Sequence, residues 1–271
     1  DSDNYSILYY SPHISVSIEE VKLRDTTLKY YSTVDDLYHF YHSLLPSEGG
    51  SPSDGLTELT ESITADLNPR ERAKAIYYWV QDNIKYVAYT EGYMGFIPAT
   101  ADEVFARRFG DCKGKSSLIK KMMEIAGLKA YYSWVGTREL PYTYSELPLP
   151  STDNHMVVAF KDNDSVFILD GTFRFIDFGM YPFSIQGKEV LVGVDSDNYF
   201  IFKVPVSGPD ESIVFDSVNI KIEGDRISGE GLRSHSGFCR YELAHAMEGV
   251  KPADYNRRLT SLFIKFINLF I

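Results

Sequence analysis

The stretch FGDCKGKSSLIKKMMEIAG, residues 109–127, predicts a turn that leads directly into a helix. Apolar residues recur at helical spacing from Ile119 to Ala126, and Gly127 stands where a helix often ends on a left-handed residue. Cys112 therefore falls at the helix N-terminus, where unpaired backbone N–H groups carry partial positive charge. Such a position stabilises a thiolate.

Charged residues surround this cysteine. Lys113 and Lys115 are expected to favour the thiolate further, whereas the carboxylate of Asp111 opposes it. A lone cysteine is more often a small buried hydrophobic residue than a nucleophile, so other residues have to indicate the chemistry. The second cysteine, Cys239, is interpreted as structural or inert, and nothing in the sequence requires the two to pair.

Two strand-like segments downstream supply a histidine and an aspartate. Residues 156–160 and 165–169 form a predicted hairpin, with a two-residue turn at 162–163 or a four-residue loop at 161–164. Either connection places His155 directly opposite Asp170. Opposed residues have Cβ atoms about 4.5–5.5 Å apart, close enough for a carboxylate to hold an imidazole N–H. Together with a cysteine at a helix N-terminus, this pair supplies a nucleophile, a base and an orienting carboxylate, which acyl transfer requires.

Three motifs resemble those of the transglutaminase-like superfamily: GDCKGKS at 110–116, NHMVV at 154–158 and LDGT at 169–172. The approach from residue 86 to residue 104 resembles a bacterial subgroup in which β-rich domains flank the catalytic core. The resemblance covers roughly residues 30–195. It implies an α+β, papain-like fold, with helices packed on an antiparallel sheet and flanking β segments.

The resemblance also assigns roles to single residues. It carries over Cys112 as the nucleophile, His155 as general base and acid, and Asp170 as the residue that orients His155. The Cys112 backbone N–H is then expected in an oxyanion hole, with Tyr93 as the candidate for a second donor. The thiolate would attack an amide, and water or an amine would resolve the thioester. Because protease, amidase and transglutaminase use the same triad, the sequence does not choose among them.

The chain is predicted to have three regions. Residues 1–29 are the end of an N-terminal β-rich domain, since Ile14, Val16 and Ile18 alternate with serines as in a half-buried strand. The catalytic domain covers 30–196, and 197–271 is a β-rich flanking region with a terminal helix. The apolar, uncapped end of the sequence predicts that the natural protein is longer.

Helices and loops are predicted within the central region. Helical spacing marks residues 34–45, and the Pro/Gly/Ser-rich stretch 46–56 is expected to be a loop. Asn68, Pro69 and Glu71 form the start signal of the next helix, and a short helix begins at Ala101. A further strand is expected at 130–135. The proline-containing loop that follows this strand is long enough to favour a functional role. Strands are also expected at 199–206, 213–222 and 227–234.

Composition limits the classes of molecule that this protein is expected to bind. A formal net charge of −11 argues against nucleic-acid binding, so the expected partner is a protein or peptide substrate. No apolar run approaches the roughly 20 residues that span a bilayer, and no signal peptide opens the sequence. The compartment is not readable from the residues. The resembled subgroup is often exported, which implies a periplasmic or extracellular location.

Two alternatives to an enzyme stay open at this point. The domain could be a binding or assembly module in which the triad is idle, and rapid alkylation of Cys112 would count against it. Cys112, His155 and Asp170 could instead hold zinc, although structural zinc prefers four ligands and catalytic zinc more histidines. The favoured interpretation needs neither a metal nor a cofactor.

Overall fold

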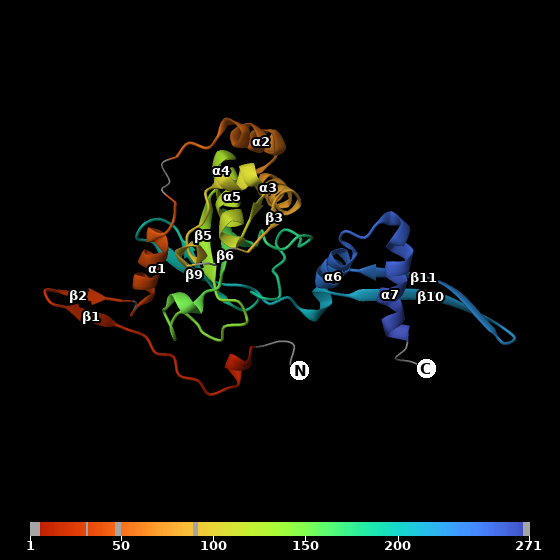
Figure 1. Ribbon diagram of the computed structural model, residues 1–271. Helices are drawn as coiled ribbons and strands as arrows, with labels where there is room; N and C mark the ends of the chain where they lie inside the picture. Colours follow the sequence, from red (N-terminus) through yellow and green to blue (C-terminus); the bar gives the residue numbers. More distant parts are fainter. Residues whose placement is uncertain (1–5, 31, 47–49, 89–91, 268–271) are drawn as a thin grey trace. The chain divides into compact units, whose positions relative to one another are not determined.

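The computed structural model describes residues 6–30, 32–46, 50–88 and 92–267 (Figure 1). The chain divides into two compact units, one formed by 1–174 and 178–206 and the other by 175–177 and 207–271. The region boundaries after residues 29 and 196 stay predictions.

A five-stranded antiparallel sheet forms the centre of the first unit, with strand order β7-β6-β5-β8-β9. Its strands are β5 (Ala130–Val135), β6 (His155–Asp162), β7 (Ser165–Leu169), β8 (Glu189–Gly193) and β9 (Tyr199–Lys203). The predicted strand positions for β5, β6, β7 and β9 are confirmed, with β9 shorter than expected. The sequence analysis missed β8, which pairs with β5 and joins β9 to the sheet.

Helices cover one face of this sheet (Figure 1). They are α2 (Asp54–Thr64), α3 (Pro69–Asn83), α4 (Ala101–Arg107) and α5 (Cys112–Ile125), and α1 (Val34–Ser43) packs on the same face beside Trp134. Ile76, Met122 and Phe160, from α3, α5 and β6, are at most 1% exposed within one shared core. Because side chains alternate across a strand, the neighbouring residues Val157 and Ala159 face the other side of the sheet. There they pack with Ile185 and Val204 in a second core.

Local signals explain where these helices begin and end. The side chain of Asn68 accepts the N–H of Glu71, whose carboxylate reaches back to the Asn68 N–H, so the predicted capping box is confirmed. Gly127 follows α5 with a φ of 73°, as expected of the residue after a helix. The predicted loop at 46–56 was wrong at its end, because α2 already begins at Asp54.

The N-terminal segment differs from the prediction. The sequence predicts a strand around Ile14, Val16 and Ile18, but within the described residues 6–24 the one strand is β1 (Glu20–Leu23), paired with β2 (Thr26–Lys29). Ile14 and Val16 lie outside any strand and are 91% and 87% exposed. Alternating apolar residues indicate a strand only where a neighbouring strand and a core are available to receive them.

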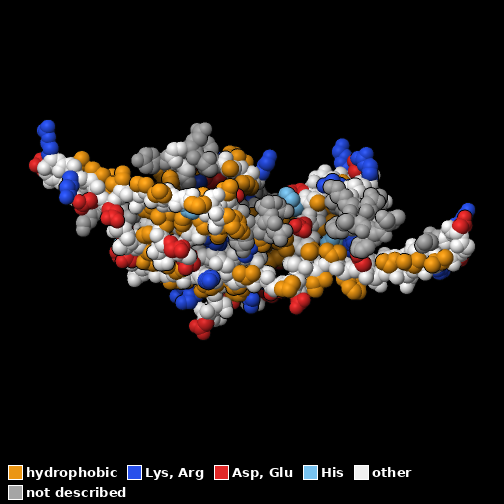
Figure 2. Space-filling view, turned by 90° about the horizontal axis from the view of Figure 1, so that it is seen from below, with side chains coloured by type: hydrophobic (Ala, Val, Ile, Leu, Met, Phe, Trp, Pro, Cys, Tyr) orange, Lys and Arg blue, Asp and Glu red, His pale blue; other side chains and the backbone are white. Residues whose placement is uncertain are grey.

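The second unit contains a long hairpin, β10 (Val214–Glu223) and β11 (Arg226–His235), followed by α6 (Gly237–Met247) and α7 (Tyr255–Ile267). Figure 2 shows hydrophobic side chains in a row along this hairpin and charged side chains gathered at its tip. Val218, Ile220 and Ile222 are between 59% and 73% exposed. Short 3-10 helices occur in both units, at Ile7–Tyr9, Gly92–Gly95, Pro150–Thr152, Pro209–Glu211 and Pro252–Asp254.

The strands and terminal helix predicted after residue 196 correspond to β9, β10, β11 and α7, while α6 had not been predicted. Of the helices in the described ranges, none combines the length and the apolar character needed to cross a membrane.

Candidate active site

Cys112 is the first residue of α5. A short parallel pairing between β3 (Lys85–Tyr86) and β4 (Phe109–Gly110) delivers the chain to this point, and the Asp111 side chain caps the helix by accepting the Gly114 N–H at 2.9 Å. Gly114 is required here, because a Cβ at this position would lie 2.9 Å from a methyl of Val104. The predicted position of the cysteine at a helix N-terminus is confirmed.

The two neighbouring lysines are not both directed at the thiol. Lys113 forms an ion pair with Asp111, and both side chains are nearly buried, so these opposite charges are close together. Lys115 is 3% exposed. Burial lowers the pKa of Lys115 to about 8, although the nearby Asp170 carboxylate acts to raise it. The expectation that both lysines simply add positive charge at Cys112 is therefore too simple.

His155 and Asp170 form a buried pair. Nε2 of His155 lies 2.7 Å from Oδ2 of Asp170, and the Asp170 side chain is fully buried. The other carboxylate oxygen accepts the N–H and the hydroxyl of Thr172, at 3.0 and 2.5 Å. Both oxygens of Asp170 therefore have partners, which fixes the carboxylate and, through it, the imidazole.

The pairing of His155 with Asp170 determines the charge of both side chains. Burial acts to lower the pKa of His155, but the Asp170 carboxylate and its hydrogen bond outweigh this effect and raise the pKa to about 10, with a further contribution from a side-chain hydrogen bond to Cys112. Burial acts to raise the pKa of Asp170, but the interaction with His155 and the Thr172 hydrogen bonds hold it below its ordinary value. The arrangement favours an imidazolium at His155 beside the Asp170 carboxylate.

The hairpin register differs from the prediction. Asp162 pairs with Ser165 and Val158 with Leu169, so the turn consists of Asn163 and Asp164, not residues 162–163. Asn163 adopts a φ of 52°, a left-handed conformation that asparagine tolerates well. The predicted direct opposition of His155 and Asp170 was therefore wrong.

The two residues nevertheless share a face of the hairpin. The register is shifted by two residues, and since side chains alternate with a period of two, such a shift leaves each side chain on its original face. His155 and Asp170 become diagonal neighbours, for which Cα atoms are typically about 7–8 Å apart, and their side chains bridge that distance.

Tyr86 lies close to the site. The sequence analysis placed it at the start of the approach that resembles the bacterial subgroup and gave it no role at the site. Burial raises its pKa, and the negative charges of Cys112, Asp111 and Asp170 raise it further. The pairing of Tyr86 with Gly110 brings it there. Sequence patterns could not reveal this contact, because β3 and β4 are too short to show periodicity. The Tyr93 side chain lies outside the described residues, so its predicted oxyanion role stays a prediction.

An aromatic cluster adjoins Cys112. The thiol packs against a core that includes Tyr41, Trp134 and Met156, and the Tyr41 ring stacks on Trp134 at 4.9 Å between centroids. Trp134 is 6% exposed. Helix α1 thus reaches the site through Tyr41 and provides part of its apolar surroundings.

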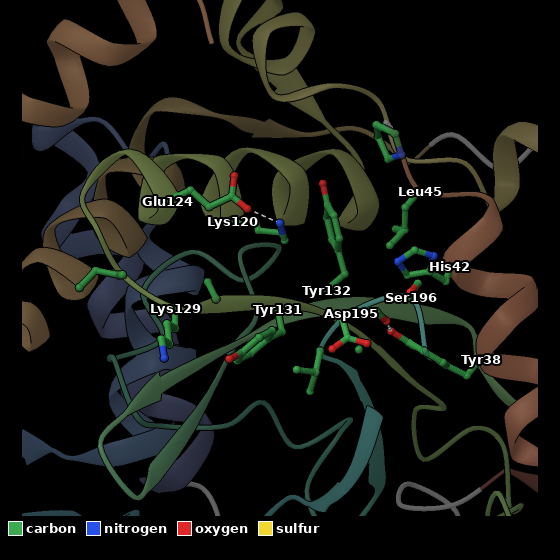
Figure 3. A pocket seen from close by; sticks show the side chains of 15 residues that line it. Tyr38, His42, Leu45, Lys120, Glu124, Lys129, Tyr131, Tyr132, Asp195 and Ser196 are labelled. Atoms are coloured by element: carbon green, nitrogen blue, oxygen red, sulfur yellow. Dashed lines mark hydrogen bonds and ion pairs between the residues drawn. The ribbon is translucent and has the colours of Figure 1, made fainter. Parts of the chain in front are cut away.

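A separate cavity of about 600 Å³ lies near the C-terminal end of α5 (Figure 3). Tyr132 extends into it between the Lys120–Glu124 ion pair and the side chains of Leu45 and His42. None of Cys112, His155 and Asp170 lines this cavity. Its lining residues are Tyr38, His42, Leu45, Pro46, Lys120, Glu124, Leu128, Lys129, Ala130, Tyr131, Tyr132, Gly193, Val194, Asp195 and Ser196.

Neither metal geometry nor a disulfide is found in the described part of the chain. Both Cys112 and Cys239 are free thiols. Within the described ranges, no three or more His, Cys, Asp or Glu side chains are grouped so that they could hold a metal ion.

Comparison of sequences identifies one family. Residues 57–170 match the profile of the Transglutaminase-like superfamily. No curated protein matches the chain.

Solved structures align with this chain at low sequence identity. A candidate protease from Parabacteroides distasonis aligns with a TM-score of 0.51 at 11% identity, over 79% of this chain and 42% of that one. A candidate cysteine protease from Cytophaga hutchinsonii gives 0.36 at 17% identity, over 68% and 54% of the two chains. Legionella pneumophila LapG gives 0.31 at 13% identity, over 51% and 72%. This chain spans less than half of the first structure, and that match supports the predicted α+β fold.

Proposed function

Because residues 57–170 match the transglutaminase-like superfamily, we propose that the protein is a cysteine-dependent enzyme that transfers acyl groups from amide bonds. The observation that carries this proposal is the buried His155–Asp170 pair, at 2.7 Å, whose histidine also interacts with the Cys112 side chain. These three groups come from α5, β6 and the end of β7, and they provide the nucleophile, the proton carrier and the orienting carboxylate of acyl transfer.

The chemistry follows from these positions. The Cys112 thiolate attacks the amide carbonyl, and as the C–N bond breaks, the His155 imidazolium gives its proton to the departing amine. A thioester remains on Cys112. Water or a second amine then attacks the thioester and gives a proton to His155, and the thiolate leaves as the acyl product forms. Asp170 keeps the imidazole oriented throughout, while the Cys112 backbone N–H at the helix N-terminus is placed to bind the oxyanion.

Proteins or peptides are the proposed substrates. The resolving nucleophile decides between hydrolysis and transamidation, and the same triad serves both. The structural neighbour described as a candidate protease makes hydrolysis the first reaction to test. An amine acceptor added to the same assay separates the two outcomes.

Alkylation of Cys112 across pH tests the proposal without a known substrate. We expect iodoacetamide to modify Cys112 faster than Cys239, at rates that persist well below pH 8, because an adjacent imidazolium stabilises the thiolate. A His155→Ala variant should lose this advantage, and a Cys239→Ala variant should retain it. Cys112→Ala should then abolish turnover of any amide substrate found for the protein.

Two results would contradict the proposal. One is full amide turnover by Cys112→Ala. The other is an ordinary thiol profile for Cys112 that does not change in His155→Ala. The second result would favour the alternative of a protein-binding or assembly module whose triad is idle.

A further inference from the structure

Three consecutive residues hold the chain immediately before His155. The Thr152 hydroxyl donates to the Leu147 carbonyl. Asn154 exchanges two hydrogen bonds with Thr137, both of 2.9 Å. Between them lies Asp153. The position of His155 at the start of β6 therefore depends on side-chain contacts made by the segment 152–154.

Asp153 is held by two buried tyrosines. The Tyr41 hydroxyl, from α1, lies 2.8 Å from Oδ2 of Asp153, and the Tyr144 hydroxyl lies 2.8 Å from Oδ1. Tyr41 is 3% exposed and Tyr144 is 1% exposed. These contacts tie α1, the loop between β5 and β6, and the start of β6 to one carboxyl group.

The number of hydrogens available for these hydrogen bonds indicates the protonation state of Asp153. The Tyr144 hydroxyl also lies 2.9 Å from the carbonyl oxygen of Trp134, which can only accept. One hydroxyl hydrogen cannot serve both this carbonyl and an ionised Asp153 at full strength. If Asp153 is a carboxylic acid, its O–H donates to Tyr144 and the Tyr144 hydroxyl donates to Trp134, so each of these two contacts contains its own hydrogen.

We propose that Asp153 is a positioning residue for His155 that acts in its protonated form, donating to Tyr144 and so fixing the start of β6. The proposal rests on the proposed function, in which His155 carries the proton. Ionisation of Asp153 would leave Tyr144 with two competing acceptors and loosen the segment 152–154. The rate of chemistry at Cys112 would fall as a result, although Asp153 contacts no reacting atom.

Burial of Asp153 favours this protonated form and outweighs the effect of the nearby Lys188 charge. Burial raises the pKa of Asp153 to about 7, against the opposing effects of the two tyrosine hydrogen bonds and of the Lys188 charge. The Lys188 ammonium donates to the carbonyls of Leu140 and Tyr142, at 2.5 and 3.1 Å. Glu189 accepts the backbone N–H of Tyr144 at 3.0 Å. Asp153 is thus expected to change its charge close to neutral pH.

An Asp153→Asn variant provides the main test, because an amide mimics the neutral acid: its NH₂ can donate to Tyr144 while its oxygen accepts from Tyr41. The measurement is the ratio of Cys112 alkylation rates, variant over wild type, from about pH 5.5 to about pH 8.5, a range that spans the expected ionisation. We expect a ratio near 1 at the acidic end that rises to about threefold at the alkaline end, the loss of one hydrogen bond in the wild type. Asp162→Asn, at the other end of β6, is the matched control and should give a constant ratio.

Two further measurements test the role of Asp153 separately from the proposed function. Tyr144→Phe removes the group that Asp153 serves, and in that background the ratio should become independent of pH. The ¹³C resonance of the Asp153 carboxyl, assigned by its loss in Asp153→Asn, should titrate near neutral pH even if Cys112 proves unreactive. Failure of the proposed function is therefore distinguishable from failure of this inference. A flat ratio for Asp153→Asn, or an Asp153 carboxyl that titrates like an ordinary aspartate, would overturn it.

Discussion

The hairpins β6–β7 and β10–β11 have similar turns but different surroundings. Each joins its strands through a two-residue turn that contains a left-handed residue, Asn163 in one and Gly224 in the other. Phe160 of the first hairpin is 1% exposed, whereas Phe215 of the second is 59% exposed. Turn chemistry is thus enough to fold a strand back on itself. Burial requires further strands and a covering layer, and these also make β6–β7 suitable to hold a buried His–Asp pair.

Replacing one phenylalanine in each hairpin by alanine should give the largest difference in the free energy of unfolding. Phe160 packs among Phe167 and Phe178 in the core, so Phe160→Ala should lower the free energy of unfolding by about 3–5 kcal/mol. Phe215→Ala should change it by no more than about 0.5 kcal/mol, as for other exposed sites. Urea unfolding of the two variants measures both values. Equal losses would mean that Phe215 is covered in solution and that the two hairpins do not differ in burial.

Replacing a glycine at each hairpin by alanine should give a smaller difference in the free energy of unfolding. A Cβ at Gly171 would lie 2.8 Å from Cδ1 of Ile119, so Gly171→Ala should destabilise the protein by about 1–3 kcal/mol. It should also slow Cys112 alkylation, because it disturbs the residue next to Asp170. Gly224→Ala meets no atom but keeps a φ of 64°, which costs about 1 kcal/mol. Alkylation should not change in Gly224→Ala, and an equal slowing in both variants would argue against a local effect at Asp170.

The buried His155–Asp170 pair and the exposed Asp216–Arg233 pair should affect the pH dependence of stability differently. This is the smallest of the expected effects. The pKa of His155 is raised from 6.5 to about 10, so its contribution is complete below pH 6.5 and is lost as the pH rises towards 10. The pKa of Asp170 is lowered from 3.8, so its contribution is present above that pH and is lost in stronger acid. The pair should therefore stabilise most between these limits.

Thermal unfolding between pH 7 and pH 10 reads out this difference. The melting temperature of the wild type should fall more steeply with pH than that of His155→Gln, since the variant has no such proton to lose. Asp216→Asn removes the exposed Asp216–Arg233 pair of β10–β11 and should leave the slope unchanged, because the pKa of Asp216 is lowered and that of Arg233 is raised, away from this range. Identical slopes in wild type and His155→Gln would contradict the assigned charge of His155.

Sequence reasoning reached the proposed triad by an argument that was partly wrong. The pairing predicted for β6 and β7 was displaced by two residues, yet it assigned His155 and Asp170 to the same face, because the displacement was even. It assigned no role to Asp153 or Tyr86. Asp153 precedes a motif and has no pattern of its own, and its importance arises from Tyr41 and Tyr144, which lie far from it in the chain.

By itself, the sequence determined the local features of this protein: the cap of α3, the glycine that ends α5, the cysteine at the α5 N-terminus, and the strands that bring His155 and Asp170 to one face. Each depends on residues within a few positions of one another, where backbone sterics and hydrogen bonding act without help from the rest of the chain. The tertiary structure alone decided the register between β6 and β7, the exposure of residues 14–18, and the two tyrosines around Asp153. These features depend on which distant segments fill the space beside a strand or a carboxyl group, and packing of the whole unit settles that question.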